Sequence, residues 1–372
     1  MELAETELSV LDFNSTNSTW VRFPKHGPQR LPPGTITDFE WKDYCPLVFR
    51  NLQQLDNISY AEYMVSICRH ETLRELSSQG KNSCLLSSPH DHRFVIKTIR
   101  KSEMKVLLEM LPNYYDHVLT YGNTLLIKFY GIHVVRPAGG YKVHFVVMRN
   151  LLQSGLYIHR RFDLKGSSQG RSVGKVVIDE SKTFKDLDLE LCFLLDPITR
   201  HRILTQVKND CEFLEAAGIM DYSLLLGIHI EASSRGSANG QSRSRSSRFS
   251  LPPDPSWKQV DPESSVSDHQ HYYEPDVKLG FEISARAVHM PRNGTGGLPL
   301  HKPYGIKEPF NVKLFFGIID ILQGYNVKKR IEHMYKSLHY DSRSISAVNP
   351  KVYSTRFQDF LCKVFQSEEQ IL

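Results

Sequence analysis

Residues 219–225 run Ile219-Met-Asp-Tyr-Ser-Leu-Leu225, so that one carboxylate stands immediately before an apolar, strand-like run. The preceding segment, Arg200–Ala217, is predicted to be an amphipathic helix that ends at Gly218. Its apolar side consists of Ile203, Leu204, Val207, Cys211 and Leu214. The chain therefore passes from a helix through Asp221 into a strand. An aspartate in this place can orient an attacking hydroxyl, and the alternative is a structural Asx turn or helix N-cap.

A second carboxylate ends an apolar run on the far side of a polar insert. From Glu231 to about Pro275 the chain is mostly Ser, Arg, Gly, Pro, Asp and His, which predicts disorder because such a segment buries little apolar surface. Pro291–Tyr304 is a second stretch rich in Gly and Pro. Strand-like sequence resumes at Lys313–Asp320. Magnesium-binding aspartates of phosphotransferases occupy such positions, although a structural turn is the alternative. We expect Asp221 and Asp320 to form one site across the gap.

The first half of the chain contains a further group of predicted elements. Phe94–Ile99 and Val143–Met148 are β-branched and aromatic runs that predict strands. Between them, Ser102–Leu111 has apolar residues at helical spacing, and we expect Pro112 to end that helix. The order of strand, helix and further strands indicates a small mixed lobe rather than an alternating parallel sheet.

Lys97 lies inside the first of these strands, where a lysine is costly unless an anion meets it. One interpretation is a clamp on nucleotide phosphates, held by Glu103 on the following helix. The alternative is an edge-strand lysine that points into water. Two polar loops also suit anions, namely Ser78–Ser83 and Phe162–Ser167, the second of which contains Lys165.

The composition is that of an ordinary globular protein of 372 residues, with 40% hydrophobic residues, 23% charged residues and a net charge of +5. The basic residues cluster, which indicates an anionic partner such as a phosphate-bearing lipid, a nucleotide or nucleic acid. The clusters are Lys97–Lys105, His159–Arg171, Arg235–Arg248 and Lys328–Arg330. The sequence lacks the dinucleotide-binding, P-loop and zincin motifs, paired cysteines, a secretory signal and an apolar stretch of membrane-spanning length. We expect a cytoplasmic protein that can still lie on a membrane.

Eight short motifs carry a family resemblance. They are Glu75-Leu-Ser-Ser, Val95-Ile-Lys-Thr-Ile, Leu111-Pro-Asn-Tyr-Tyr, Lys128-Phe-Tyr-Gly, Asp163-Leu-Lys-Gly-Ser, Phe184-Lys-Asp-Leu-Asp, Ile219-Met-Asp-Tyr-Ser-Leu-Leu and Gly317-Ile-Ile-Asp-Ile-Leu-Gln. From about Ile36 to Leu372 the chain resembles the phosphatidylinositol-phosphate kinases. The resemblance implies an α+β, two-lobed kinase domain over residues 36–372, with an antiparallel-sheet N-lobe and a mixed C-lobe. Residues 1–35 would be a flexible leader, and a disordered insert at about 231–310 would interrupt the domain.

The resemblance also implies roles for individual residues around ATP and Mg²⁺. Lys97 matches the family's ATP-phosphate lysine, and Glu103 matches its helix partner. Asp221 matches the catalytic aspartate, and Asp320 matches the aspartate that binds magnesium. Gly80 matches the glycine loop, Met148 and Asn150 match the hinge beside adenine, and Lys165 matches the lysine of the Asp-Leu-Lys-Gly-Ser motif, a substrate-binding residue. Lys329 and Arg330 match a dibasic pair that docks on anionic headgroups, and Lys328 adds a third charge there.

The implied activity is that of a 1-phosphatidylinositol-4-phosphate 5-kinase. Such an enzyme transfers the ATP γ-phosphate to the 5-hydroxyl of phosphatidylinositol 4-phosphate and makes phosphatidylinositol 4,5-bisphosphate. Glu332 favours this type I specificity, since type II members carry alanine there. The partner would be phosphatidylinositol 4-phosphate in anionic membranes, with the protein peripheral on their cytosolic face.

A second hypothesis is a weakly active or inactive scaffold. Type I glycine loops carry a second glycine where this chain has Ser83, whose side chain can hinder close approach of the backbone to phosphate. In this respect the chain resembles a divergent, 5-kinase-like branch of the family. Such a protein would localise and regulate active type I kinases by hetero-association, or would self-associate. RNA binding through Arg243–Arg248 is a weaker hypothesis, because this short run lacks aromatic partners.

Overall fold

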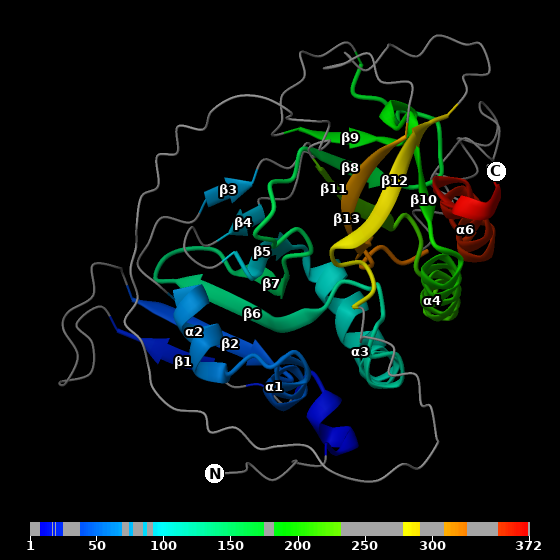
Figure 1. Cartoon of the computed structure of the whole chain (residues 1–372). Helices are drawn as coiled ribbons and strands as arrows, with labels where there is room; N and C mark the ends of the chain where they lie inside the picture. Colours follow the sequence, from blue (N-terminus) through cyan, green and yellow to red (C-terminus); the bar gives the residue numbers. More distant parts are fainter. Residues whose placement is uncertain are drawn as a thin grey trace, which may run out of the picture. The chain divides into compact units, whose positions relative to one another are not determined.

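The computed structural model describes residues 8–16, 18, 20–24, 38–68, 74–76, 85–87, 92–174, 182–231, 278–290, 309–325 and 349–370. Their strands form two seven-stranded sheets, and these belong to one compact unit, Met1–Glu231 with Leu279–Leu372 (Figure 1). This arrangement confirms the predicted α+β class with two lobes, each built on its own sheet. Among the described residues, no helix combines the length and hydropathy that crossing a bilayer requires.

The first lobe is built on an antiparallel sheet with the strand order β1-β2-β6-β7-β5-β4-β3. Its strands are β1 (Trp20–Phe23), β2 (Phe39–Tyr44), β3 (Arg74–Leu76), β4 (Leu85–Ser87), β5 (Phe94–Ile99), β6 (Phe129–Pro137) and β7 (Val143–Arg149). Also in this lobe are the 3-10 turn η1 (Val10–Phe13) and the helices α1 (Pro46–Leu55), α2 (Tyr60–Cys68) and α3 (Lys101–Thr120). Since β5 lies between β4 and β7, Lys97 is not on an edge strand.

The second lobe is built on a mixed sheet with the strand order β14-β10-β12-β13-β11-β8-β9. Its strands are β8 (Arg160–Leu164), β9 (Thr183–Lys185), β10 (Leu191–Leu195), β11 (Ser223–Ile230), β12 (Ile283–His289), β13 (Phe310–Ile319) and β14 (Phe365–Ser367). The pairs β8–β9 and β10–β14 are parallel, and the other neighbours are antiparallel. The helices α4 (Pro197–Ala216) and α6 (Pro350–Val364) pack on each other, and η2 (Asp186–Asp188) and η3 (Glu368–Gln370) are short 3-10 turns.

The elements expected from local periodicity are present, with one correction. β5 confirms the strand Phe94–Ile99, β7 contains Val143–Met148, and Gly218 follows α4 with a φ of +67°. Pro112, however, does not end α3, which continues to Thr120. A proline in a helix interior costs about 3 kcal/mol, and buried residues on both sides of it hold α3 against the core. They are Met104, Leu107, Met110, Leu111, Tyr114, His117 and Val118.

Two stretches that were expected to lack regular structure each contain a strand. Trp20–Phe23, within the expected leader, forms β1 and pairs with β2. Ile283–His289, within the expected insert, forms β12 between β10 and β13, and its three buried side chains alternate with exposed or half-buried ones. Composition averaged over the whole insert hides so short an alternation. Residues 232–277 and 291–308, where we expected disorder, lie outside the described residues.

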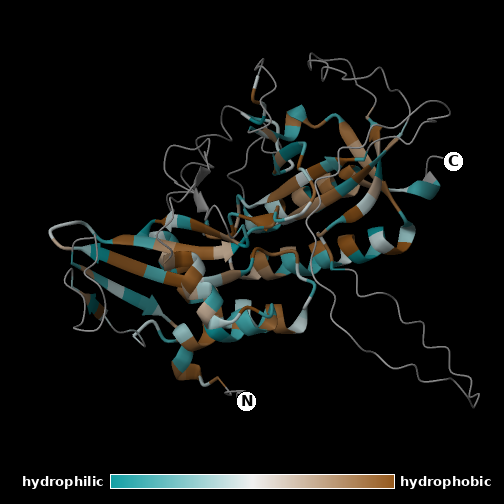
Figure 2. Cartoon of the chain, turned by 60° about the vertical axis from the view of Figure 1, so that its left-hand side comes forward, coloured by the Kyte–Doolittle hydropathy of each residue, from teal (hydrophilic) through white to brown (hydrophobic). Residues whose placement is uncertain are grey.

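One apolar core runs through both lobes. Its buried members include Leu107 of α3, Ile132 of the first sheet, Leu314 of the second sheet and Tyr353 of α6. In Figure 2, hydrophobic segments follow the strands of both sheets, as expected for sheets that bury a face. A smaller cluster lies around Tyr63 of α2. The two lobes are therefore packed as one hydrophobic unit.

The segment between α3 and β6 also joins the lobes through the backbone. Ile318 of β13 donates its amide to the Leu125 carbonyl at 2.7 Å and accepts the Ile127 amide at 2.8 Å. These two hydrogen bonds flank a parallel bridge between Leu126 and Ile318. The connection fixes β13, in the second sheet, against the chain that leads into the first sheet.

The buried carboxylate of Asp210 on α4 holds the same segment. It accepts the Leu125 amide at 2.8 Å and the Thr124 hydroxyl at 2.7 Å. It also contacts the His117 ring of α3 at 2.7 Å and the Gln206 amide of α4 at 2.8 Å. A fully buried carboxylate is tolerable when it has this many polar partners. Asp210 thus connects α3, α4 and the segment that joins the lobes.

Replacement of Asp210 by alanine is expected to lower the free energy of unfolding by about 3 kcal/mol or more, since it leaves several buried donors without their acceptor. Urea unfolding followed by circular dichroism measures this change. Asp116, exposed on α3, provides the control, and its alanine variant is expected to stay within about 0.5 kcal/mol of wild type. A wild-type midpoint for Asp210→Ala would contradict the assigned role.

Candidate functional site

Asp221 and Asp320 are brought to the same end of the second sheet. Asp221 stands just before β11 and Asp320 directly after β13, and these strands pair antiparallel with Ser223 opposite Ile319. Both aspartates have positive φ angles, +64° for Asp221 and +61° for Asp320. Left-handed backbone is uncommon for residues other than glycine, and such outliers gather at functional sites. The expectation of one site assembled across the insert therefore agrees with the strand register.

Each of these carboxylates pairs with a lysine from another element. Lys165, directly after β8, donates from Nζ to Asp221 Oδ1 at 2.8 Å and to the Asp221 carbonyl at 2.6 Å. Lys97, on β5 of the first lobe, donates to Asp320 Oδ1 at 2.6 Å. The exposed fraction of the four side chains lies between 13% for Lys165 and 40% for Asp320, so none is sealed from solvent. The site thus presents one lysine from each lobe.

The charges of the two pairs act on each other. Partial burial raises the pKa of Asp320, but attraction to Lys97, the hydrogen bond from Lys97 and attraction to Lys165 outweigh burial. The pKa of Asp320 consequently lies below its ordinary value, and the carboxylate is ionised at neutral pH. Lys165 is therefore near enough to influence Asp320 as well as Asp221.

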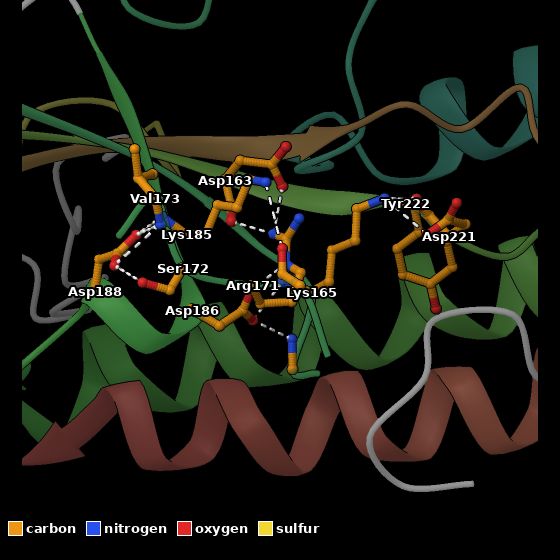
Figure 3. A network of polar contacts seen from close by, with 12 residues as sticks. Asp163, Lys165, Arg171, Ser172, Val173, Lys185, Asp186, Asp188, Asp221 and Tyr222 are labelled. Atoms are coloured by element: carbon orange, nitrogen blue, oxygen red, sulfur yellow. Dashed lines mark hydrogen bonds and ion pairs between the residues drawn. The ribbon is translucent and has the colours of Figure 1, made fainter. Parts of the chain in front are cut away.

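A buried carboxylate holds the turn that carries Lys165 (Figure 3). Asp186 Oδ1 accepts the backbone amides of Lys165 and Gly166 at 2.8 and 2.6 Å, while Oδ2 accepts Nε of Arg171 at 2.5 Å. Gly166 has a φ of +68°, and a Cβ added there would lie 2.9 Å from Cβ of Phe360 on α6. The turn requires glycine for both reasons. Asp186 therefore sets the direction in which Lys165 leaves the backbone.

Arg171 ties this turn to the preceding strand. Its guanidinium donates to the carbonyl of Asp163 on β8 and to the Asp163 carboxylate, the latter at 2.9 Å. Burial lowers the pKa of Arg171, but Asp163 and Asp186 outweigh burial and raise the pKa above its ordinary value. Figure 3 shows the Arg171 side chain between the two carboxylates. The turn is consequently held by charge-assisted hydrogen bonds on both sides.

Glu103, the expected partner of Lys97, interacts elsewhere. Its carboxylate accepts the backbone amide of Arg100 at 2.8 Å and pairs with Nε of Arg100 at 3.2 Å. Glu103 is the third residue of α3, where a carboxylate can cap the free amide at the helix start. In the described structure Lys97 therefore pairs with Asp320 and not with Glu103, whose role towards the cofactor stays a prediction.

The expected hinge residues lie at the end of β7. Met148 is paired with Val95 in the sheet and is partly buried against the core. Asn150 donates its backbone amide to the Arg93 carbonyl at 2.8 Å and its side-chain amide to the His92 carbonyl at 2.7 Å. These contacts join the end of β7 to the turn before β5, and a position beside adenine stays a prediction.

The remaining sequence candidates lie outside the described residues, and they are Gly80, Ser83, Lys328, Lys329, Arg330 and Glu332. Conversely, sequence reasoning assigned no role to Asp163, Arg171 or Asp186. Two of these three lie in motifs that carried the family resemblance, Asp163-Leu-Lys-Gly-Ser and Phe184-Lys-Asp-Leu-Asp. Their interaction could not be inferred from either motif alone, because it depends on the parallel pairing of β8 with β9.

The residues at this end of the sheet suit Mg²⁺ that arrives with a phosphate ligand. In nucleotide sites Mg²⁺ is usually held by one or two carboxylates together with phosphates and waters. Asp320 would supply the carboxylate for the metal, and Lys97 and Lys165, the lysines paired with Asp320 and Asp221, would supply cations for phosphate oxygens. Within the described ranges, no group of three or more His, Cys, Asp or Glu side chains is placed to hold a metal alone.

Replacement of Asp186 by alanine is expected to lower the free energy of unfolding by about 3 kcal/mol, as for other broken buried ion pairs. It should also accelerate hydrogen exchange at the amides of Lys165 and Gly166, which mass spectrometry can localise. Asp188→Ala is the matched control, since Asp188 accepts the amides of Val173 and Lys185 at 3.1 and 2.9 Å. Faster exchange at the same amides in both variants would contradict a specific role for Asp186.

Comparison with known proteins identifies a matching family and several similar relatives. Residues 67–364 match the family described as Phosphatidylinositol-4-phosphate 5-Kinase. Phosphatidylinositol 4-phosphate 5-kinase 1 from Arabidopsis thaliana is 45% identical over 379 residues, which cover 97% of this chain and 50% of that relative. Phosphatidylinositol 4-phosphate 5-kinase 3 from the same plant is 45% identical and is likewise covered over 50% of its length, so the chain spans about half of these two relatives.

A third relative is matched along nearly its whole length. Phosphatidylinositol 4-phosphate 5-kinase 10 from Arabidopsis thaliana is 42% identical over 420 residues, and the match covers 98% of each chain. The family match spans most elements of both lobes and all four residues of the two lysine–aspartate pairs. With that match and these identities, the chain belongs to the phosphatidylinositol-4-phosphate 5-kinase family.

Proposed function

We propose that this protein is a lipid kinase that transfers the γ-phosphate of ATP to the 5-hydroxyl of phosphatidylinositol 4-phosphate. The observation that carries the proposal is the pair of contacts Lys165–Asp221 and Lys97–Asp320 at one end of the second sheet. Two cations and two carboxylates suit phosphoryl transfer, in which catalysis rests on positioning and on charge stabilisation. The names of the relatives, phosphatidylinositol 4-phosphate 5-kinases, support this choice of lipid.

Each of the four residues has a role in the proposed reaction. Asp221 orients the attacking 5-hydroxyl of the lipid and accepts its proton. Lys97 and Lys165 exchange their carboxylate partners for phosphate oxygens when ATP binds. Since each lysine begins in an ion pair with a carboxylate, the incoming phosphate would replace one anion by another at each cation.

Asp320 is the residue that would hold Mg²⁺ in this reaction. Its Oδ1 atom is freed when Lys97 moves to phosphate, and its lowered pKa keeps the carboxylate ionised. Bound Mg²⁺ would neutralise charge on the β- and γ-phosphates. The carboxylate of Asp221, once Lys165 has moved to phosphate, would be available to the 5-hydroxyl.

The lipid substrate would place the reaction on the cytosolic face of an anionic membrane, with the protein bound peripherally. The expected headgroup contacts at Lys328–Arg330, and the type I residue Glu332, lie outside the described residues. Their part in the proposal therefore rests on the sequence, where each basic residue near an anionic leaflet contributes about 1 kcal/mol.

Wild-type protein supplied with MgATP and liposomes that contain phosphatidylinositol 4-phosphate is expected to make phosphatidylinositol 4,5-bisphosphate. Asp221→Asn and Lys165→Met should each lower kcat at least ~100-fold, because they remove the group that orients the hydroxyl or a cation that binds phosphate. Chromatography of the labelled, deacylated headgroups measures both the rate and the ring position.

The controls for this assay are Asp116→Asn and Lys208→Met, which change exposed residues of α3 and α4 and should retain the wild-type rate. The enzyme proposal would be contradicted if the wild-type protein made no more phosphatidylinositol 4,5-bisphosphate than Asp320→Asn does. The scaffold hypothesis would then take its place, and co-precipitation of an active type I kinase tests it.

MgATP is expected to raise the melting temperature of the wild-type protein, since a ligand at 100 times its Kd stabilises the folded state by about 2.7 kcal/mol. Lys97→Met and Asp320→Asn should reduce this shift, and chelation of Mg²⁺ should reduce it for wild type. Differential scanning fluorimetry measures each case, with Lys208→Met as the unaffected control. A full shift in Lys97→Met would rule out the assigned contact between Lys97 and ATP.

A further inference from the structure

Helix α6 packs against the two turns that carry the candidate residues Lys165 and Asp221. At Gly166, an added Cβ would lie 2.9 Å from Phe360 Cβ and 3.3 Å from the Arg356 carbonyl, so the backbone of this turn approaches α6 closely. At Tyr222, the ring lies 4.6 Å from the Tyr353 ring and 5.1 Å from the Phe357 ring, measured between centroids. One face of α6 therefore supports both the Lys165 turn and the Asp221 turn.

The Tyr222 side chain contacts two aromatic rings and one cysteine sulfur. Both neighbouring rings meet it at steep angles, 70° for Tyr353 and 80° for Phe357, which is the favourable edge-to-face geometry. Its hydroxyl donates to Sγ of Cys211 on α4 at 3.6 Å. Tyr222 is fully buried, and so is Tyr353. The peptide that follows Asp221 is thus anchored in the core, although the Asp221 side chain is 25% exposed.

Two successive carbonyls of this turn are held by side chains from different elements. Lys165 Nζ donates to the Asp221 carbonyl at 2.6 Å, and the Tyr353 hydroxyl donates to the Tyr222 carbonyl. Asp221, which carries the first of these two carbonyls, has a φ of +64°. A left-handed conformation of this kind persists only when surrounding contacts determine it. The lysine contact, however, is the one that phosphate would displace in the proposed reaction.

We propose that Tyr353 is a positioning residue for Asp221: its hydroxyl fixes the Tyr222 carbonyl and thereby the backbone from which the Asp221 carboxylate projects. When Lys165 turns to phosphate, the Tyr353 contact still holds the turn after Asp221, and before Asp221 the Met220 amide still donates to the Gln323 carbonyl at 3.0 Å. Tyr353 does not touch the reacting atoms, so its effect passes through Asp221. The kinetic part of this inference rests on the proposed function of Asp221 as the group that orients the hydroxyl.

Loss of this hydroxyl has a defined physical consequence. Tyr353→Phe keeps the ring and its packing on Tyr222 but leaves the buried Tyr222 carbonyl without that donor. A buried carbonyl that loses a donor favours a rotated peptide or a water in its place. Either change moves the Asp221 carboxylate, and small displacements of a positioning group cost rate rather than affinity for ATP.

The test compares Tyr353→Phe with Tyr63→Phe. Tyr63 of α2 is also buried, and its hydroxyl is hydrogen-bonded to Nε2 of His133 at 2.6 Å in the smaller cluster of the first lobe. Both variants lose one buried hydroxyl of the same kind, so general destabilisation affects both. Two measurements are made on the full chain: lipid-kinase kinetics on phosphatidylinositol 4-phosphate liposomes, and hydrogen exchange at residues 219–224 referenced to the global stability of each variant.

Tyr353→Phe is expected to lower kcat at least ~10-fold with the KM for ATP unchanged within about twofold, and to accelerate exchange at residues 219–224. Tyr63→Phe should change neither quantity beyond its effect on global stability. A wild-type kcat in Tyr353→Phe, or local exchange no faster than in Tyr63→Phe, overturns the assignment. If the wild-type protein has no lipid-kinase activity, the proposed function fails, and the exchange result alone decides whether Tyr353 positions Asp221.

Discussion

The backbone pairing of Leu125–Ile127 with Ile318 is the contact on which the candidate site depends. It attaches the first lobe to β13 only two residues before Asp320. Lys97 belongs to the first lobe, and its 2.6 Å contact with Asp320 would carry a large entropic cost if the lobes were free to separate. The Asp210 carboxylate, by accepting the Leu125 amide, couples the same segment to α4. A junction made of backbone and a buried charge therefore sets the geometry of the site.

The two aspartates share a second constraint. Both have a left-handed backbone conformation, with positive φ, at the point where the chain enters or leaves the second sheet. A left-handed residue other than glycine costs roughly 1–2 kcal/mol, and surrounding contacts must offset this. For Asp221 those contacts include a lysine that is part of the proposed reaction and a tyrosine that is not. In the proposed reaction the site can therefore exchange one contact for a phosphate while the other keeps the turn in place.

Much of the fold followed from local pattern, and the exceptions have identifiable causes. Phe94–Ile99 forms a strand because a β-branched, apolar run suits a buried sheet wherever it lies. Pro112 did not end α3, since packing against the core on both sides outweighed the local cost. The strand β12 was not predicted within the polar insert, because its strand conformation depends on pairing with β10 and β13 rather than on its own composition.

For the site, the sequence by itself determined which chemical groups are available, namely Lys97, Lys165, Asp221 and Asp320, and the family to which the chain belongs. Only the tertiary structure decided how they pair. Glu103 was the nearer candidate for Lys97, yet it caps its own helix by accepting the free backbone amide of Arg100. The partner that Lys97 does have is 223 residues distant, and only sheet register and the junction of the lobes bring it to the lysine.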